Sequence, residues 1–248
     1  MKDDISYIID HLDSSSEKDI LQGLDLLDQF LFNLVPEIQL HVDNFTHSDQ
    51  LRAFIKLQDN AALNVVSYLA KIYNRELAND QLVKLNRTVQ GCLLIHPASR
   101  AIFNRAKNMT RLLNVLHESN DIAVSITLVS TLIHIVLDEY ENFRTFERCG
   151  GCGVLIRHLK LNSIDEFPQS KPPNHSSPIS SSSPSSSTTA ISNQQNLNFK
   201  IIEFLMLYMT EEPDNTHGLT VKEKSKLFEK DCPEIDLLVE SLIELNKL

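Results

Sequence analysis

Hydrophobic residues recur along this chain at the spacing of an α-helix rather than that of a β-strand. Near the N-terminus, five apolar residues step by four, three, four and three positions, which places them on one face of a helix. The same spacing returns close to the C-terminus, and sustained strand-type alternation is absent. The two stripes are Ile20, Leu24, Leu27, Leu31 and Leu34, and then Ile235, Leu238, Leu242 and Leu245. We therefore expect an all-α protein.

The middle of the chain contains further helical segments. Residues 61–76 and 80–96 are typical of a helix pair, with Asn79-Asp80 as the boundary. The most apolar run, Ile122 to Leu137, is interrupted by serine, threonine and histidine and has 16 residues, fewer than the ~20 of a membrane span. It indicates a buried helix. Residues 197–212 are apolar on nearly every side, so we expect that helix to be deeply buried as well.

A Ser/Pro-rich segment interrupts this helical pattern. Residues 163–196 contain few large apolar side chains, so the segment cannot bury enough apolar surface to offset the entropy of ordering it. We expect a disordered loop inside a single domain of residues 1–248, because helical periodicity resumes at about Leu197. Ser177-Pro178 and Ser183-Pro184 are minimal proline-directed phosphorylation sites within it, so Ser177 and Ser183 are candidate modification sites.

Three segments of the chain resemble one another. Each has phenylalanine, then lysine or arginine two positions later, then leucine nine positions later. They begin at Phe54, Phe103 and Phe146, with offsets of 49 and 43 residues, close to the ~40–47 residues of armadillo or HEAT units. A unit of two or three helices cannot bury its apolar face alone, so neighbouring units stack. The sequence therefore predicts an armadillo/HEAT-like helical solenoid, although similarity among leucine-rich helices is an alternative explanation.

Charge is unevenly distributed along the chain. The net charge of −10 argues against attraction to nucleic acid or to an anionic membrane. Residues 71–111, however, hold 8 Lys/Arg against 2 Asp/Glu and carry +6, between two acidic flanks. This segment is either an ordinary solvated surface or a docking surface for an acidic or phosphorylated partner. The candidate contacts are Arg87, Arg100, Arg105 and Arg111, although Arg100 has the alternative of holding the turn at Pro97.

The stretch Cys149-Gly150-Gly151-Cys152-Gly153 has the spacing of half a zinc site or of a thiol–disulfide motif. A second cysteine pair is absent, since Cys92 and Cys232 are isolated, and the βαβ context of a redox motif is absent as well. In the repeat alignment this stretch falls where one helix ends and the next begins. We therefore interpret it as a glycine turn flanked by small core residues, with metal binding or redox chemistry as the alternative.

Other catalytic signatures are missing from the sequence. It has no Gly-rich phosphate loop, no Gly-x-Ser-x-Gly elbow and no His-Glu-x-x-His. The first residues, MKDDISYIIDHLDSSSEKD, lack the basic and apolar regions of a secretory signal, so we expect a cytoplasmic protein with reduced cysteines. We expect neither a cofactor nor a bound metal, and no enzymatic activity.

Three stretches together resemble a known family. LNRTVQGCLLIHPASRAIF (85–103), ENFRTFERCGG (141–151) and IIEFLMLYMTEE (201–212) are similar to the fungal cell division control protein 14 family, a septation initiation network component unrelated to the similarly named phosphatase. The resemblance covers residues 86–160 and 199–245 and is weaker before residue 80. Arg148-Cys149 and the long Ser/Pro-rich segment depart from the family pattern.

This resemblance implies a non-catalytic subunit that pairs with a germinal-centre-type protein kinase. We expect the contact to involve a regulatory segment of the kinase outside its catalytic domain. The pair would form a hetero-oligomer and act at the spindle pole body to promote septum formation and cytokinesis. An armadillo-type adaptor in another process, such as nuclear transport or trafficking, is the alternative function.

Overall fold

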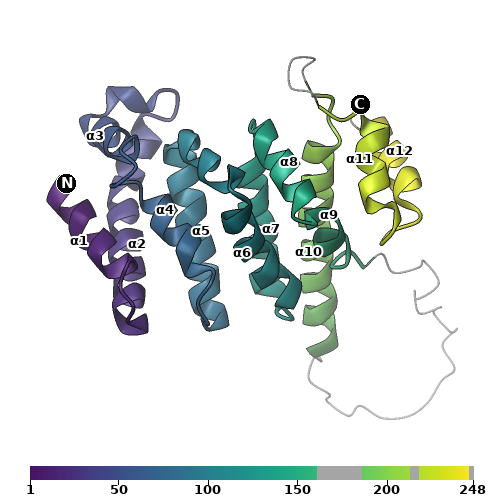
Figure 1. The fold of residues 1–248 in the computed structure, drawn as a ribbon, viewed down its shortest axis with the longest axis horizontal. Helices are drawn as coiled ribbons and strands as arrows, with labels where there is room; N and C mark the ends of the chain where they lie inside the picture. The colour runs from purple at the N-terminus through teal and green to yellow at the C-terminus, as the bar shows by residue number, and fades with distance from the viewer. Residues whose placement is uncertain (161–185, 213–217, 246–248) are drawn as a thin grey trace, which may run out of the picture.

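The computed structural model describes residues 1–160, 186–212 and 218–245, and every regular element in these ranges is helical (Figure 1). The all-α prediction is confirmed for this part of the chain. The elements are α1 (Lys2–Leu12), α2 (Glu17–Leu40), η1 (Phe45–His47), α3 (Asp49–Gln58), α4 (Val65–Ile72), α5 (Asn79–Ile95), η2 (Pro97–Asn104), α6 (Ala106–Glu118), α7 (Ile122–Val136), α8 (Tyr140–Arg148), α9 (Gly151–Ile156), α10 (Ser186–Tyr208), α11 (Val221–Glu229) and α12 (Ile235–Leu245).

Polar side chains fix where several of these helices begin. An oxygen of the N-cap side chain accepts a hydrogen bond from a backbone N–H of the first turn, which would otherwise lack a partner. This arrangement occurs at the starts of α2, α3, α4, α7 and α11, through Ser16, Ser48, Asn64, Asp121 and Thr220. Local sequence therefore determines where these five helices begin. Tertiary packing determines how the helices are arranged.

The helices follow one another in a row from the N-terminus to the C-terminus (Figure 1). From α3 onward the same order occurs three times, namely a short helix, a second helix and a long helix. The three sets are α3–α4–α5, η2–α6–α7 and α8–α9–α10. Equivalent helices of successive sets pack on each other, with α5, α7 and α10 in one series and α4, α6 and α9 in another. The preceding helix α2 packs on α5.

The internal repeat seen in the sequence coincides with these three sets. Phe54, Phe103 and Phe146 lie in the short helices α3, η2 and α8, and each side chain is fully buried. Of the leucines nine positions later, Leu112 and Leu155 are fully buried in the second helices, whereas Leu63 is half-buried in the turn before α4. The phenylalanines therefore occupy equivalent core positions in all three sets, and the leucines do so in two of them.

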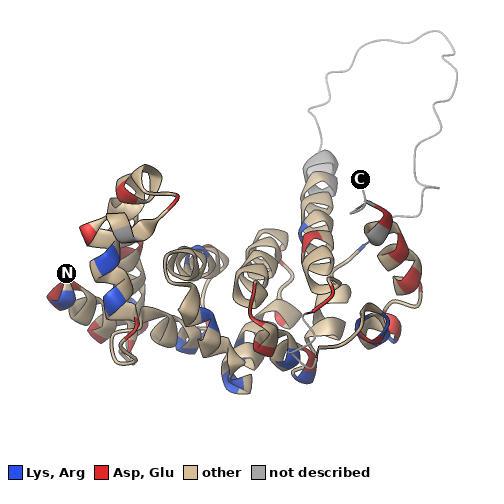
Figure 2. Cartoon of the chain, turned by 90° about the horizontal axis from the view of Figure 1, so that it is seen from above, with Lys and Arg blue, Asp and Glu red and all other residues tan. Residues whose placement is uncertain are grey.

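Viewed from above, the row of helices curves into an arc (Figure 2). Comparison of the two views places the long helices α5, α7 and α10 on the concave side, and α4, α6 and α8 on the convex side. One continuous hydrophobic core runs through the arc from Ile5 of α1 to Leu242 of α12.

The chain re-enters this core through α10, which packs along α7. The sequence predicted a disordered loop up to residue 196, whereas α10 begins at Ser186, so that boundary was placed too late. Two side-chain hydrogen bonds anchor the middle of the helix: Gln194 Nε2 donates to the carbonyl of His158, and Asn198 Nδ2 donates to that of Lys160. The helix is not buried on every side either, because Phe199 is 68% exposed.

Candidate functional site

The four arginines of the predicted docking surface lie in different environments. Arg87 is exposed on α5, and Arg105 is exposed at the residue that precedes α6. Arg111 is half-buried on α6, where Nη1 lies 3.5 Å from Oδ1 of Asn108. Arg87 lies on a concave-side helix, whereas α6 lies on the convex side (Figure 2). The structure therefore does not bring the four arginines together as one patch.

Arg100 is buried, which corrects its assignment as a surface contact. Its side chain is in the core, and Nη1 donates a hydrogen bond of 2.8 Å to the carbonyl of Leu137. The carbonyl of Arg100 in turn accepts from Nδ2 of Asn142 at 2.9 Å. Because residue 100 lies in η2 and residues 137 and 142 flank the start of α8, Arg100 joins two successive sets of helices.

Part of the basic character of residues 71–111 is neutralised within the molecule. Lys71 Nζ lies 2.7 Å from a carboxylate oxygen of Asp13, and Lys84 forms an ion pair with Asp25. The carboxylate of Asp25 is also the main cause of the raised pKa of Lys84. Both carboxylates belong to the acidic N-terminal segment, so the charge asymmetry of the sequence is partly cancelled by folding.

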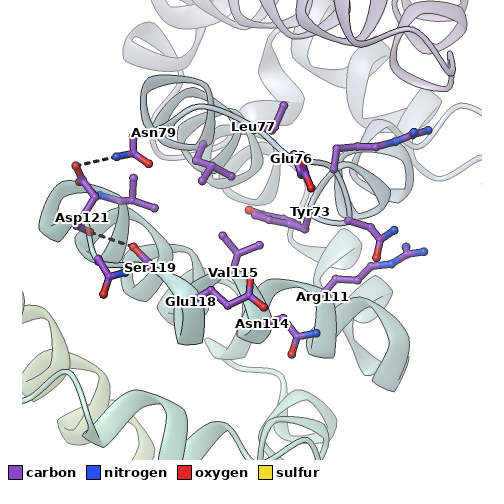
Figure 3. A pocket seen from close by; sticks show the side chains of 15 residues that line it. Tyr73, Glu76, Leu77, Asn79, Arg111, Asn114, Val115, Glu118, Ser119 and Asp121 are labelled. Atoms are coloured by element: carbon purple, nitrogen blue, oxygen red, sulfur yellow. Dashed lines mark hydrogen bonds between the residues drawn. The ribbon is translucent and has the colours of Figure 1, made fainter.

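A polar groove of about 560 Å³ lies between the α4–α5 connection, α6 and the α6–α7 connection (Figure 3). Arg111 lies at one end of the groove and Asp121 at the other, where Asn79 Nδ2 donates to a carboxylate oxygen of Asp121 at 3.1 Å. The charged residues lining it are Arg75, Arg111, Glu76, Glu118 and Asp121, two cations against three carboxylates. This composition does not favour an acidic or phosphorylated ligand at this groove.

A second groove, of about 450 Å³, lies between α2 and α5 and is mainly apolar. We call it the α2–α5 groove. Two large apolar residues of the groove are mostly exposed to solvent: Phe32 is 73% exposed and Leu94 is 55% exposed. Its lining residues are Asp28, Gln29, Leu31, Phe32, Val35 and Ile38 of α2, Phe45 of η1, and Arg87, Thr88, Gly91, Leu94 and Ile95 of α5. Neighbouring large apolar side chains in contact with water make this groove a candidate interaction surface.

The α2–α5 groove continues into a more polar cavity of about 570 Å³ toward the start of α5. Asp28 and Arg87 line both cavities, so they lie where the apolar and polar parts meet. Arg87 makes no hydrogen bond or ion pair within the described ranges. Of the four predicted arginines, it is the one with a free guanidinium group at a groove.

The α2–α5 groove was missed by the sequence reasoning, although a signal for it exists. The stripe of α2 that packs into the core contains Leu24, Leu27 and Leu34. Phe32 falls outside that stripe, toward the face of the helix that should be polar, and Val35 lies at the edge of the stripe. Large apolar residues on the polar face of an amphipathic helix are the pattern that would have indicated the groove.

The stretches that carry the family resemblance take part in two polar networks, whose members are mostly buried, although the Asp59 side chain is exposed. In the first, His96 Nδ1 lies 2.7 Å from Ser99 Oγ, and His96 Nε2 lies 3.1 Å from a carboxylate oxygen of Asp59. Ser99 Oγ also accepts from Nδ2 of Asn64 at 2.8 Å. These residue types match those of a catalytic triad, but Ser99 is 2% exposed and its hydroxyl is fully engaged. The network connects α3, α4 and η2.

The second network connects α8, α10 and α11. Arg144 Nη2 contacts carboxylate oxygens of Glu147 at 2.8 Å and Glu212 at 2.9 Å. The hydroxyl of Tyr208 donates to Glu147 at 2.5 Å, and Lys224 Nζ lies 2.7 Å from Glu212. Burial raises the pKa of Glu147, an effect opposed by the Tyr208 hydrogen bond and by Arg144. The signature residues of two distant stretches therefore meet in the interior.

The predicted turn between α8 and α9 occurs at Cys149 and Gly150, and residues 151–153 of the stretch begin α9. Gly150 has φ of +76°, in the left-handed region that favours glycine. A Cβ atom on Gly151 would lie 2.3 Å from the ring of Phe146, so the close approach of α8 to α9 requires glycine there. Cys152 is buried, and burial raises its pKa to about 12, which makes its thiol a poor nucleophile.

The candidate phosphorylation sites Ser177 and Ser183 lie outside the described residues. Within the described ranges, no helix combines the length and the hydropathy that a bilayer crossing needs.

Comparison with known proteins identifies the family. Residues 37–219 match the family described as cell division control protein 14, SIN component. A relative, cell division control protein 14 of Schizosaccharomyces pombe, is 23% identical over 199 residues, which span 72% of this chain and 70% of the relative. No solved structure matches the chain. The family match covers well over half of the sequence, and the chain therefore belongs to the cell division control protein 14 family of septation initiation network components.

Proposed function

We propose that this protein is a non-catalytic binding subunit that promotes septum formation and cytokinesis by holding a germinal-centre-type protein kinase. The observation that carries the proposal is the family match over residues 37–219, whose description names a septation initiation network component. The kinase partner comes from the resemblance of the signature stretches. The two proteins form a hetero-oligomer that works in the cytoplasm and at the spindle pole body.

The architecture that we propose for this task is an armadillo-type solenoid. Three observations support it: the threefold order of short, second and long helix, the packing of equivalent helices on each other, and the curvature of the row (Figure 2). Stacked helical units create an extended concave surface on which another polypeptide can lie.

A non-catalytic role is supported by the placement of the chemistry-bearing residues. Ser99 and His96, which have the residue types of a hydrolase site, are buried and hold helices together. Cys152 is held in its thiol form by burial. The residues available at the grooves are apolar groups, amides and isolated charges, which suit binding rather than bond-making chemistry.

For the kinase contact, Arg87 is the arginine that the geometry favours, because its guanidinium group is exposed and free at the α2–α5 groove. Arg105 and Arg111 remain candidates for a separate contact near α6. A bidentate pair between a guanidinium and a carboxylate or phosphate is among the stronger polar contacts between proteins.

Affinity purification of the tagged full-length chain from its native cells tests the proposal. A germinal-centre-type kinase should co-purify at close to equal stoichiometry and should remain bound at 0.5 M salt if an apolar surface contributes to the contact. Quantitative mass spectrometry with a tag-only control measures this enrichment. Recovery of transport or trafficking factors instead, with the kinase at background level, would support the adaptor alternative.

A further inference from the structure

The α2–α5 groove is built from two parallel stripes of side chains. Leu31, Phe32 and Val35 of α2 follow the i, i+1, i+4 spacing, and Ile38 continues the same surface. From Leu31 to Ile38 the groove is about 10 Å long at 1.5 Å per residue, which equals about two turns of a docked helix. The groove is therefore long enough to bind a short helical segment of about two turns.

Gly91 creates the depth of this groove. It lies in the C-terminal half of α5, one turn after Arg87 and three residues before Leu94. A Cβ atom placed on Gly91 would meet a single neighbour, the Cδ1 atom of Leu31 at 3.5 Å, so the space above the glycine is open. Glycine inside a helix is unfavourable by about 1 kcal/mol relative to alanine. Its position here opens space between the two stripes that a larger side chain would fill.

The chemistry of the groove indicates what occupies it. Its walls are helices whose backbone groups are already paired, so a ligand cannot add as a β-strand and must bind through side chains. The apolar floor requires apolar side chains on one face of the ligand. Arg87 is exposed at the polar end and can pair with one carboxylate of the ligand, whereas Asp28, Asp80 and Asp121, which line the same cavity with Lys84, would repel any further negative charge.

We propose that an amphipathic helix of the kinase, from outside its catalytic domain, docks in the α2–α5 groove. Its apolar side chains at i, i+3 or i+4, and i+7 lie between Phe32, Val35 and Leu94, and one carboxylate pairs with Arg87. The proposal rests on the proposed function, because it names the surface that receives the kinase.

Filling the groove gives the most selective test. Gly91→Leu places a side chain in the open space, whereas Gly91→Ala is a matched control that adds one methyl group in ordinary van der Waals contact with Leu31. Both changes raise helix propensity, so neither should unfold the protein. We expect Gly91→Leu to weaken binding of the purified full-length kinase by at least about tenfold, as expected for blocking an interface centre. Gly91→Ala should bind within about threefold of the wild type.

Truncation tests the apolar part of the groove, and charge reversal tests its polar end. Phe32→Ala and Leu94→Ala should each weaken kinase binding by about tenfold or more, with Leu237→Ala on α12, 66% exposed, as the control outside the groove. Arg87→Glu should weaken binding, whereas Lys222→Glu on α11 should not. A carboxylate-to-lysine substitution in the kinase helix that restores binding to Arg87→Glu would support the proposed ion pair.

The outcomes separate this inference from the proposed function. Wild-type protein that fails to bind the kinase would overturn both. Wild-type binding that Gly91→Leu, Phe32→Ala and Leu94→Ala all leave unchanged would overturn the groove assignment alone. Light scattering tests whether a second copy of this chain occupies the groove instead. A wild-type homodimer that Gly91→Leu converts to monomers would show this and would overturn the inference.

Discussion

Lys224 of α11 has no exposed surface, and its ammonium group is surrounded by oxygen atoms. Nζ donates to the carbonyls of Tyr208 and Thr210, both at 2.8 Å, and pairs with Glu212 at 2.7 Å. A buried ion pair is strongly destabilising when one partner is removed, because the other charge stays buried without compensation. Glu212 would then depend on Arg144 alone.

Replacing Lys224 by methionine should therefore lower the free energy of unfolding by roughly 3–5 kcal/mol. Urea denaturation followed by circular dichroism measures this loss. Lys222→Met, an exposed position on the same helix, should change stability by no more than about 0.5 kcal/mol. Adding Glu212→Gln to Lys224→Met should cost less than the sum of the two single changes. Equal stabilities for the two lysine variants would contradict the buried-pair interpretation.

His158 provides a residue-level prediction of pH dependence. Burial lowers its pKa below the ordinary value, although its hydrogen bond to the carbonyl of Leu116 at 2.9 Å opposes the shift. The unfolded chain therefore takes up a proton at this residue before the folded chain does. The contribution of neutral His158 to the free energy of unfolding is complete above about pH 6.5, the ordinary histidine pKa. It is lost as the pH falls through the lowered pKa of His158 in the folded protein.

The measurement compares the free energy of unfolding at pH 7.5 and 5.5 in the wild type and in His158→Gln. The variant should lose less stability between the two pH values than the wild type does, because it has no proton to take up. His47→Gln, at an exposed histidine, is the matched control and should retain the wild-type difference. A His158→Gln protein with an unaltered pH dependence would show that this imidazole is not coupled to folding.

At the scale of single elements, the α8–α9 turn depends on two adjacent glycines for different reasons. Gly150 needs a left-handed backbone with φ of +76°, but its surroundings are empty. Gly151 needs space, because the ring of Phe146 occupies the place of a Cβ atom. Gly150→Ala should cost about 1–2 kcal/mol through backbone strain, and Gly151→Ala about 1–3 kcal/mol through overpacking.

Second substitutions distinguish the two mechanisms by urea denaturation. Gly150→Asn should cost less than Gly150→Ala, since asparagine tolerates the left-handed region. Combining Gly151→Ala with Phe146→Leu should cost less than the sum of the single changes, because a smaller side chain leaves room for the added methyl group. Additive costs in the second pair would mean that Phe146 is not the neighbour that excludes a side chain.

Elements governed by local patterns were predictable from the sequence, whereas those governed by distant partners were not. The stripe of Ile20, Leu24 and Leu27 lies in the core, because helical periodicity directly reports a buried face. The start of α10 was placed too late because the residues before Leu197 are polar in composition, yet the amide of Gln194 donates to the backbone carbonyl of His158. A composition-based argument cannot detect such a partner.

The candidate site shows the same division. Net charge along the sequence selected the segment that contains Arg87, but it could not show that Arg100 lies inside the fold or that Lys84 pairs with Asp25. Those outcomes depend on which helices become neighbours. Arg87 differs from them because its helix faces a groove, and that groove exists only once α2 and α5 pack together.

At the scale of the whole molecule, α10 closes the core that the first 160 residues leave open. It packs along α7 and adds Phe204 and Tyr208 to an aromatic cluster with Phe143 and Phe146. All four side chains are almost completely buried, so residues 1–160 alone would expose a large apolar surface. The single-domain prediction therefore has a direct test that treats the two parts as separate chains.

Residues 1–160 expressed alone should aggregate or lack a cooperative unfolding transition, because the faces of α7 and α8 that α10 covers would meet water. Co-expressed with residues 186–248 as a second chain, they should form a soluble complex that elutes as one species in size-exclusion chromatography. Phe204→Ala in the second chain should weaken this complex, since deleting a buried phenylalanine side chain costs about 3–5 kcal/mol. Phe199→Ala, on the exposed side of the same helix, is the matched control and should leave it intact. If residues 1–160 alone were monomeric and unfolded cooperatively, their core would be complete without α10. That result would contradict the single-domain prediction and indicate two domains.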